Sequence, residues 1–346
     1  MNIVVLCGGV SSEREISLRS STKVANALKS KGHNVIMIDV FFGEEIKPSF
    51  TDNSNFQVKN DENYFQKKAD ELRNKNNLIN DQLIKETGLF GKNVIDICKE
   101  ADIVFIGLHG ENGEDGKVQA AFDELKIKYT GSDSASSAIA MSKYKTKEIV
   151  AKHIRMPKGV VLHKDNPFQD EIKAPCVIKP NNGGSSVGVE IVFNQNDYNA
   201  ALERDFKYDS TVLVEEYIKG RELTQAVLDG VALPPVEICP DKDEWYDYTN
   251  KYNGITKEVC PANITANVLD EMSKSSVLFG ELIGLCVYYR IDYLLTDDGL
   301  LYALEANSLP GMTDTSLVPQ EAKAIGISYP DLCQKIIDIS LKKYND

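Results

Sequence analysis

Two carboxylates and an amide near the C-terminus are the side chains in this sequence best placed to bind a cation. Two stretches of alternating apolar and polar residues flank Asp298-Gly299, a dipeptide typical of a two-residue type I′ hairpin turn. That turn places Asp292 opposite Glu305, and Arg290 opposite Asn307, on one face of the hairpin. The pattern therefore predicts two acids and an amide clustered on one surface.

Opposed carboxylates repel each other across a hairpin, so this pairing needs an explanation. A solvated charged face is one possibility. The alternative is a divalent cation, because Asp, Glu and Asn oxygens are hard ligands suited to Mg²⁺ that is shared with nucleotide phosphates. We therefore predict a metal site formed by Asp292, Glu305 and Asn307.

A glycine-rich loop after a short strand is a candidate phosphate site. The strand ends at Lys179, and the loop that follows contains Gly183, Gly184 and Gly188 with two serines. Glycines let backbone N–H groups approach phosphate oxygens, and the lysine supplies a positive charge. The spacing differs from a Walker A loop. A plain hairpin turn is the competing interpretation.

Two further segments carry polar residues at strand ends. Residues 211–218 read as a buried strand with a polar end, where backbone groups could pair with an adenine ring and Glu222 could hold a ribose; an ordinary strand end explains the same pattern. His109 begins a glycine-punctuated acidic turn between a strand and a helix. Its loop position leaves a functional role and a structural role equally open.

The elements that must position these groups begin with an α/β unit. Residues 3–7, 34–38 and 102–108 read as buried strands, and a helical pattern follows the first of them. They predict a parallel sheet with ligand-binding loops at the carboxyl ends of its strands, where Glu13 and His109 lie. Residues 43–100, rich in Asn, Lys, Asp and Glu, are interpreted as a peripheral, partly helical insertion.

The rest of the chain predicts two more units. After a helical stretch, short strands at 175–180, 187–193 and 211–217 indicate a small α+β domain, and strands with a helix near 266–285 indicate a third. The expected boundaries are 1–131, 132–215 and 216–346. The fold class is thus mixed α/β and α+β.

Composition excludes several classes of function. A net charge of −13 opposes sequence-independent binding to nucleic acid. No apolar run approaches the ~20 residues that a membrane span needs, and the N-terminus lacks the pattern of a signal peptide. Seven scattered cysteines without a CxxC pair read as reduced core residues. A cytoplasmic enzyme is the expectation.

Six motifs in order resemble the D-alanine–D-alanine ligases of the ATP-grasp superfamily and span nearly the whole chain. They begin at Gly8 (GGVSSEREIS), His109 (HGENGEDG), Lys179 (KPNNGGSSVG), Tyr246 (YDYTNKY), Arg290 (RID) and Glu305 (EANSLPGMT). The resemblance implies a three-domain ATP-grasp fold with an N-terminal Rossmann-like domain, usually as a homodimer. It also implies ATP-dependent synthesis of D-alanyl-D-alanine for peptidoglycan, with two Mg²⁺ or Mn²⁺ ions.

The same resemblance implies a role for each matching residue. ATP phosphates would contact Lys143, Lys179 and Lys251, the last from a closing loop. Adenine and ribose would lie against Glu215, the backbone of Glu216, Tyr217 and Ile218, and Glu222. The first D-alanine would meet Glu13, fastened with Ser185 and Tyr252, and lie near His109. Arg290 and the Gly311 N–H would face the reacting carboxylate, while Ser316 and Leu317 would line the second-substrate site and Asp292, Glu305 and Asn307 would hold the metal ions.

Three alternatives remain beside this interpretation. A D-lactate or D-serine ligase of the same superfamily would differ at the second substrate, and Tyr252 and Leu317 favour D-alanine. A non-catalytic nucleotide-binding protein on the same scaffold predicts the loss of a metal or phosphate group, yet all are present. An NAD-dependent dehydrogenase is disfavoured because Gly8-Gly9 lacks the full G-x-G-x-x-G pattern.

Overall fold

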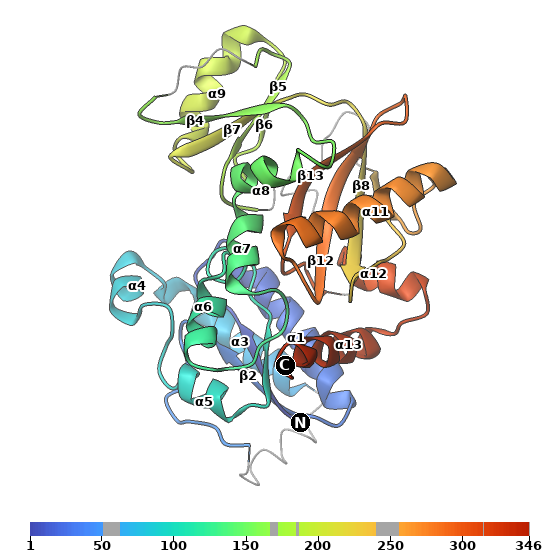
Figure 1. The fold of residues 1–346 in the computed structure, drawn as a ribbon. Coiled ribbons are helices and arrows are strands. Elements are labelled where there is room, and N and C mark those ends of the chain that lie inside the picture. Colours follow the sequence, from blue (N-terminus) through green and yellow to red (C-terminus); the bar gives the residue numbers. More distant parts are fainter. Residues whose placement is uncertain (51–62, 167–171, 185–186, 240–255, 314, 346) are drawn as a thin grey trace.

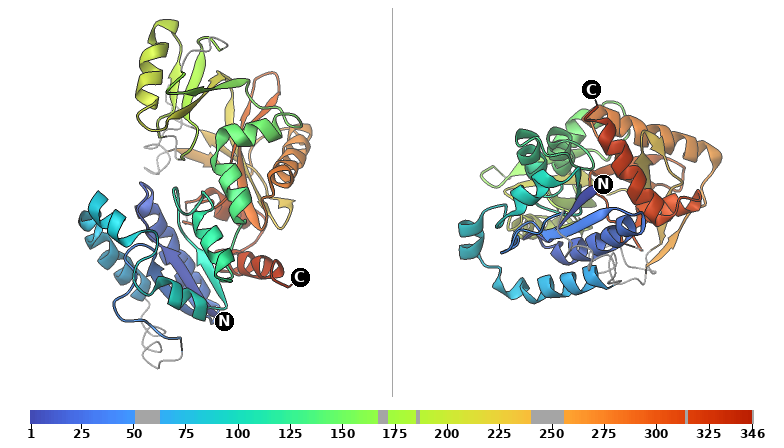
Figure 2. Two further views of the ribbon diagram at one scale, coloured as in Figure 1. Left: turned by 60° about the vertical axis from the view of Figure 1, so that its left-hand side comes forward. Right: turned by 90° about the horizontal axis from the view of Figure 1, so that it is seen from below.

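The structure, a computed structural model, describes all residues except 51–62, 167–171, 185–186, 240–255, 314 and 346. The described residues form a parallel sheet, a small antiparallel sheet and a larger antiparallel sheet. Figure 1 shows the parallel sheet at one end of the molecule, the small sheet at the other and the larger sheet beside them. Helices lie against each sheet in the rotated views (Figure 2).

The sequence predicts a parallel sheet here, and the structure confirms it with the strand order β2-β1-β3. Its strands are β1 (Asn2–Cys7), β2 (Asn34–Asp39) and β3 (Ile103–Ile106). They are apolar along most of their length because the sheet is buried on both faces. The surrounding helices are α1 (Arg14–Ser30), α3 (Tyr64–Asn74), α4 (Asp81–Thr87), α5 (Val94–Glu100) and α6 (Lys117–Glu124).

The interpretation of residues 43–100 as a peripheral insertion is wrong for two of their helices. Phe65 on α3 and both Val94 and Ile97 on α5 are fully buried in the same core as β1. The apolar residues of α3 are separated by charged ones and α5 is only seven residues long, so the polar composition of the whole segment hides both helices. Part of this segment therefore closes the N-terminal core.

The small sheet is antiparallel with the order β4-β7-β5-β6. One face packs against α9 (Tyr198–Asp205) through Cys176, Ile178, Val192 and Val214. Because strand side chains alternate between faces, the residues between these point to the other side. The strands are β4 (Gly159–His163), β5 (Cys176–Pro180), β6 (Glu190–Val192) and β7 (Thr211–Glu216).

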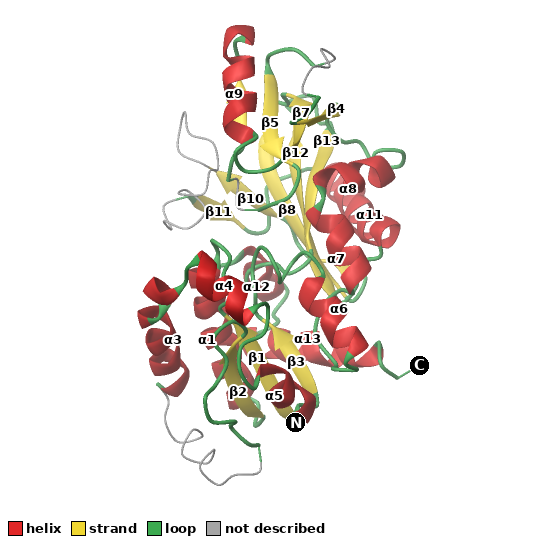
Figure 3. Ribbon diagram, turned by 90° about the vertical axis from the view of Figure 1, so that its left-hand side faces the viewer, coloured by secondary structure: helices red, strands yellow, loops and turns green. Residues whose placement is uncertain are grey.

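The larger sheet runs β11-β10-β8-β12-β13, with β9 beside β8, and every pair is antiparallel. Figure 3 shows α11 (Ala266–Ile283), α7 (Ser134–Met141) and α8 (Lys143–Val150) on one side of it, with α12 (Leu317–Ala324) below. Its strands are β8 (Arg221–Leu228), β9 (Val231–Ala232), β10 (Val236–Cys239), β11 (Lys257–Val259), β12 (Tyr288–Leu295) and β13 (Leu301–Asn307).

The β12–β13 hairpin confirms the predicted pairs but not the predicted turn. Asp292 lies opposite Glu305 and Arg290 opposite Asn307. The connection is not a two-residue turn, because the Thr296 N–H donates to the Leu300 carbonyl at 3.0 Å and three residues lie between them, ending in Gly299 with φ 84°. A bulge between Asp292 and Tyr293 in the register then compensates for the longer turn.

The C-terminal helix α13 (Tyr329–Lys342) joins a core that is formed mainly by the start of the chain. Its buried residues Leu332, Cys333, Ile336 and Ile337 belong to the core that contains β1 and β3. Conversely, Val150 and residues near it pack with α11 and the larger sheet. The hydrophobic cores therefore do not follow linear segments of the chain, and the boundaries at 131/132 and 215/216 stay predictions.

No helix among the described residues is long and apolar enough to cross a membrane.

Candidate active site

A cavity of about 1500 Å³ lies where the three sheets meet. Its lining includes residues from the first loop of the parallel sheet, the free face of the small sheet and the β12–β13 hairpin. It brings together all of the predicted site residues that the structure describes: Glu13, His109, Lys143, Lys179, Glu215, Glu216, Tyr217, Ile218, Glu222, Arg290, Asp292, Glu305, Asn307, Gly311, Ser316 and Leu317. The predicted residues Ser185, Lys251 and Tyr252 lie outside the described residues.

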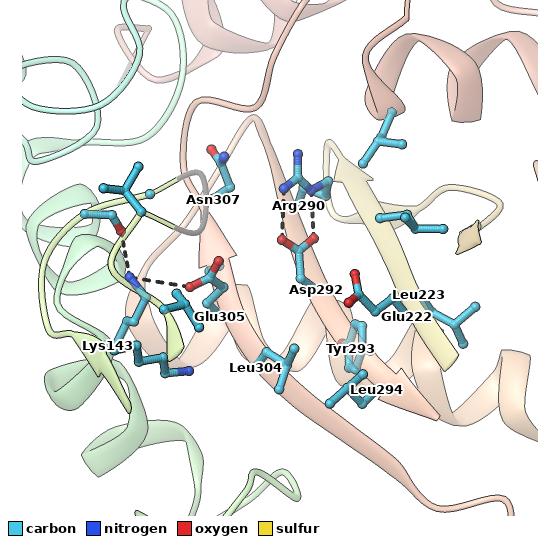
Figure 4. Close-up of a pocket in the computed structure, with 18 of the residues that line it drawn as sticks. Lys143, Glu222, Leu223, Arg290, Asp292, Tyr293, Leu294, Leu304, Glu305 and Asn307 are labelled. Atoms are coloured by element: carbon cyan, nitrogen blue, oxygen red, sulfur yellow. Dashed lines mark hydrogen bonds and ion pairs between the residues drawn. The ribbon is translucent and has the colours of Figure 1, made fainter. Parts of the chain in front are cut away.

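The opposed acids of the hairpin face this cavity, each beside a cation of the chain (Figure 4). Arg290 donates from Nε to Asp292 Oδ1 at 2.8 Å and from Nη2 to Oδ2 at 2.9 Å. Thr224 Oγ1 donates to the same Oδ1 at 2.6 Å. Glu305 Oε2 lies 3.5 Å from Lys143 Nζ. The repulsion expected between the two carboxylates is thus offset on both sides.

The donor chemistry of the hairpin suits a hard divalent cation. Asp292, Glu305 and Asn307 supply carboxylate and amide oxygens on the cavity side, which is the ligand type of Mg²⁺ or Mn²⁺. No group of three or more His, Cys, Asp and Glu side chains within the described ranges is placed to hold a metal by itself. The residues therefore fit an ion whose coordination is completed by ligands from outside the protein, such as phosphate oxygens.

A buried ion cluster holds Lys179 against the cavity. Glu215 Oε2 lies 2.6 Å from Lys179 Nζ, and its Oε1 lies 2.6 Å from Lys147 Nζ. Burial by itself raises the pKa of Glu215, but Lys179 and Lys147 outweigh burial and lower it overall. Burial lowers the pKa of Lys147, whereas Glu215 and Glu305 raise that of Lys179 despite its burial. Two cations around one anion leave a net positive charge at this wall.

Lys147 was not predicted from the sequence. It lies one helical turn after Lys143 on α8, so the two lysines share a helix face. That spacing is the only signal in the sequence, and it is common on solvated helices. The role of Lys147 is visible only in the folded structure, where it pairs with Glu215 of β7 in the small sheet.

The strand end at β7 narrows the predicted adenine contacts. The Glu216 N–H donates to the Lys158 carbonyl at 2.9 Å, and the Tyr217 N–H donates to the Pro175 carbonyl at 3.3 Å. These two backbone donors are therefore already used within the sheet. Ile218 follows these two residues in the cavity lining, and its backbone stays a predicted adenine contact.

The N-terminal loops place two predicted residues at the opposite end of the cavity. Glu13 is buried, and a β-carbon on Gly110 or Gly184 would lie 3.2 Å or 3.9 Å from its carboxylate oxygens. His109 is also buried, with Nδ1 3.6 Å from Glu114 Oε1 and Nε2 3.2 Å from Ser20 Oγ. Burial lowers the pKa of His109, but Glu114 and then Glu13 raise it overall.

The last group of predicted residues lines the cavity at the start of α12. Gly311 approaches Ser316 so closely that a β-carbon on it would lie 2.8 Å from the Ser316 hydroxyl, which accepts from the Thr313 N–H at 2.9 Å. Leu317 begins α12 and packs on Val236 and Ile238 of β10. Glu258 of β11 also lines this end, and burial raises its pKa. Nothing in the sequence around Glu258 distinguishes it from a surface acid.

Two antiparallel sheets line one cavity, one with the buried Lys179 and the other with opposed acids on a hairpin, and this is the arrangement of an ATP-grasp enzyme. Family models described as "D-ala D-ala ligase N-terminus" and "D-ala D-ala ligase C-terminus" match residues 2–132 and 150–338. The chain belongs to the family of D-alanine–D-alanine ligases.

Individual relatives match over the whole length. A D-alanine–D-alanine ligase from Pediococcus pentosaceus is 42% identical over 100% of this chain and 99% of its own length, and one from Lacticaseibacillus casei is 39% identical over 100% and 97%. Two solved structures share the fold with a TM-score of 0.75. The ATP complex of a D-alanine–D-alanine ligase from Bacillus anthracis (29% identity) covers 99% of this chain and 98% of its own. A D-Ala:D-Ser ligase from Enterococcus faecalis (27% identity) covers 98% and 99%.

Proposed function

We propose that this enzyme joins two D-alanine molecules, at the expense of ATP, into the dipeptide used for peptidoglycan precursors. The observation that carries the proposal is the pair Asp292 and Glu305, opposed on one hairpin and facing Lys143 and Lys179 in the same cavity. Two acids that hold a cation and two lysines that hold phosphates are what phosphoryl transfer from a nucleotide requires.

The nucleotide occupies the space between the small and the larger sheet. Lys143 and Lys179 contact its phosphates, and Lys251 joins them from the closing segment. Glu222 binds the ribose, and the chain from Glu215 to Ile218 borders the adenine. The Glu215 carboxylate is engaged with two lysines, so its contribution to nucleotide binding passes through Lys179.

Asp292, Glu305 and Asn307 hold two Mg²⁺ or Mn²⁺ ions together with the nucleotide phosphates. Such ions neutralise charge on a transferring phosphoryl group.

The D-alanines occupy the remaining two regions of the cavity. Glu13 binds the ammonium group of the first D-alanine, near His109, and Ser185 and Tyr252 complete a hydrogen-bonded set that fastens the closing segment. Ser316 and Leu317 line the second site, where Leu317 forms an apolar wall with Ile238.

The chemistry follows from the weakness of a carboxylate as an electrophile. One oxygen of the first D-alanine attacks the γ-phosphorus of ATP, the bond to the β-phosphate oxygen breaks, and D-alanyl phosphate and ADP form. The amine of the second D-alanine then attacks the acyl carbon and loses a proton, and phosphate leaves. Arg290 and the Gly311 N–H face the oxyanion of the tetrahedral intermediate, where loss of one donor typically slows a reaction by about 10²–10³.

A D-serine ligase is the second candidate, because a D-Ala:D-Ser ligase matches the fold with the same TM-score as a D-alanine–D-alanine ligase. Leu317 at the second site favours the methyl group of D-alanine over a hydroxyl group, because a buried hydroxyl needs a hydrogen-bond partner. Phosphate release with D-alanine, D-serine, D-lactate and L-alanine, measured side by side at neutral pH, separates the candidates. The greatest release with D-serine would replace the proposal.

Glu305→Ala tests the metal assignment. The variant should lose at least 10²-fold in the rate of phosphate release while it keeps the wild-type circular dichroism spectrum, because Glu305 lies on the cavity surface rather than in a core. Asp298→Ala is the matched control, since Asp298 is an exposed acid in the turn of the same hairpin. Wild-type rates in E305A at low Mg²⁺ would refute the assignment.

The proposal also covers domains, assembly and compartment. The domain boundaries lie at 131/132 and 215/216, the enzyme is a homodimer, and it works in the cytoplasm. Seven free cysteine thiols agree with a reducing compartment.

A further inference from the structure

The free face of the small sheet is a continuous wall of the cavity. Val177 of β5 lies opposite Glu215 on one side and opposite Ile191 on the other, and cross-strand partners share a face. All three line the cavity. Their neighbours in sequence, such as Cys176 and Val192, point into the core under α9. The face that remains is therefore directed into the cavity.

This wall ends in two aromatic rings. Phe193 follows β6 and Tyr217 follows β7, so both come level with Pro175, which directly precedes the intervening strand β5. Their ring centroids are 5.3 Å apart with an interplanar angle of 67°, an edge-to-face contact. Both rings line the cavity.

Phe193 is poorly covered for a phenylalanine. Its side chain is 68% exposed. Among the described residues, Val187 is the other exposed large hydrophobic residue in the cavity lining, and it is only 39% exposed. Tyr208 on the same unit has a similar exposure of 64% but does not line the cavity. An apolar ring held by an aromatic neighbour at a ligand cavity is suited to cover a flat, apolar face of the ligand.

The distance along the wall matches a nucleotide. The aromatic pair lies level with Pro175, which directly precedes β5 and is four residues before Lys179, a separation of about 13 Å for extended chain. Lys179 marks the phosphate end under the proposed function. The aromatic end therefore lies where the base of the same nucleotide is expected.

We propose that Phe193, braced by Tyr217, forms the outer wall of the base site and packs against the adenine ring of ATP. This inference rests on the proposed function and adds a contact from β6 to the predicted contacts from β7. It makes Phe193 a determinant of affinity for the base and leaves the phosphate and D-alanine contacts to other residues.

The test compares Phe193→Ala, Phe193→Trp and the matched control Tyr208→Ala. Base–aromatic contacts predict that F193A raises the KM for ATP roughly tenfold, with kcat and the KM for D-alanine unchanged. F193W and Y208A should stay within twofold of wild type. Inhibition by tripolyphosphate, which lacks a base, should be equal in wild type and F193A, whereas inhibition by adenosine should weaken in F193A.

A KM for ATP within twofold of wild type in F193A would overturn the inference. So would an equal loss of tripolyphosphate and adenosine inhibition, because that pattern indicates a distorted sheet instead of a lost base contact. If the wild type released no phosphate from ATP with D-alanine, the proposed function would fail instead. Calorimetric titration of wild type and F193A with ATP would then still test the wall, and equal affinities would overturn it.

Discussion

Charge at the centre of the site is organised by single residues. Lys147, Glu215 and Lys179 lie in one buried row, with 2.6 Å between each lysine nitrogen and a carboxylate oxygen. An unpaired buried charge is far costlier than a paired one. Glu215 therefore allows two buried lysines to stay charged. The cluster keeps a net positive charge, and Lys179 presents it to the cavity.

Glu215→Gln should be strongly destabilising for this reason. It leaves two buried lysines without a counter-charge, so the free energy of unfolding should fall by about 3–5 kcal/mol in urea titrations at pH 7. Glu216→Gln is the matched control, because Glu216 is only partly buried and accepts a single hydrogen bond from the Lys158 N–H at 2.8 Å. Equal stability of the two variants would contradict the argument.

The same two variants should also differ in how their stability depends on pH. The pKa of Glu215 is lowered from 4.5 in the folded state, so its stabilisation is present at neutral pH and is lost as the pH falls through the folded pKa. The acid limb of the stability profile should therefore be less steep in E215Q than in E216Q.

At the scale of elements, α12 is fastened to the larger sheet by a buried acid. Ala226 of β8 lies between the segments that pair with β10 and β9, and its N–H donates to Glu321 Oε2 at 2.6 Å. Burial raises the pKa of Glu321 well above 4.5 even though the Ala226 N–H and Arg290 lower it. Glu321 thus holds α12, which begins at Leu317, against β8 at Ala226, the residue that lies opposite Arg290 of β12.

Glu321→Leu should cost about 1–3 kcal/mol of stability, because it leaves the buried Ala226 N–H without an acceptor. Glu321→Gln keeps an acceptor and cannot ionise. Since the folded pKa of Glu321 is raised, its contribution is greatest at low pH and is lost as the pH rises, so E321Q should match or exceed wild type at pH 8. Urea unfolding at pH 6 and pH 8 measures both effects, and equal stability of E321L and wild type would rule out the tether.

At the scale of the whole molecule, the chain returns to its start. The C-terminal helix α13 fills the core of the N-terminal sheet, and the Tyr344 hydroxyl receives the Tyr129 N–H at 3.0 Å. The end of the chain is therefore fixed to the unit formed by its beginning, and the cavity lies between the units that are joined in this way. Relative placement of the acids, lysines and Glu13 depends on this closure.

Removal of residues 329–346 should prevent the N-terminal unit from folding. It removes the buried side chains of Leu332, Ile336 and Ile337, each worth about 1.5–3 kcal/mol, and the total approaches the stability of an ordinary domain. Expression in the soluble fraction and thermal unfolding measure the loss. Removal of residues 345–346 alone is the control and should leave the melting temperature unchanged; a stable, cooperative protein without α13 would contradict the packing argument.

Local patterns determined much of this protein. Alternation along residues 288–307 and the turn residues between them were enough to place Asp292 opposite Glu305, and apolar runs were enough to predict the parallel sheet. Even there, the three-residue turn and the bulge were missed, and the predicted pairs held only because these two deviations cancel. The residue left without a partner at the bulge is Leu304 of β13, and neither the alternation nor the turn residues mark it.

Tertiary structure alone decided which distant residues meet. The pairing of Lys147 with Glu215, the burial of Phe65 and Val94, and the return of α13 to the first core each join segments that are far apart in the chain. Periodicity and turn chemistry are properties of neighbouring residues, so they can be read in sequence order. Which face covers which core depends on the total apolar area buried and on the charges that must be paired within it, and those quantities exist only once the chain has folded.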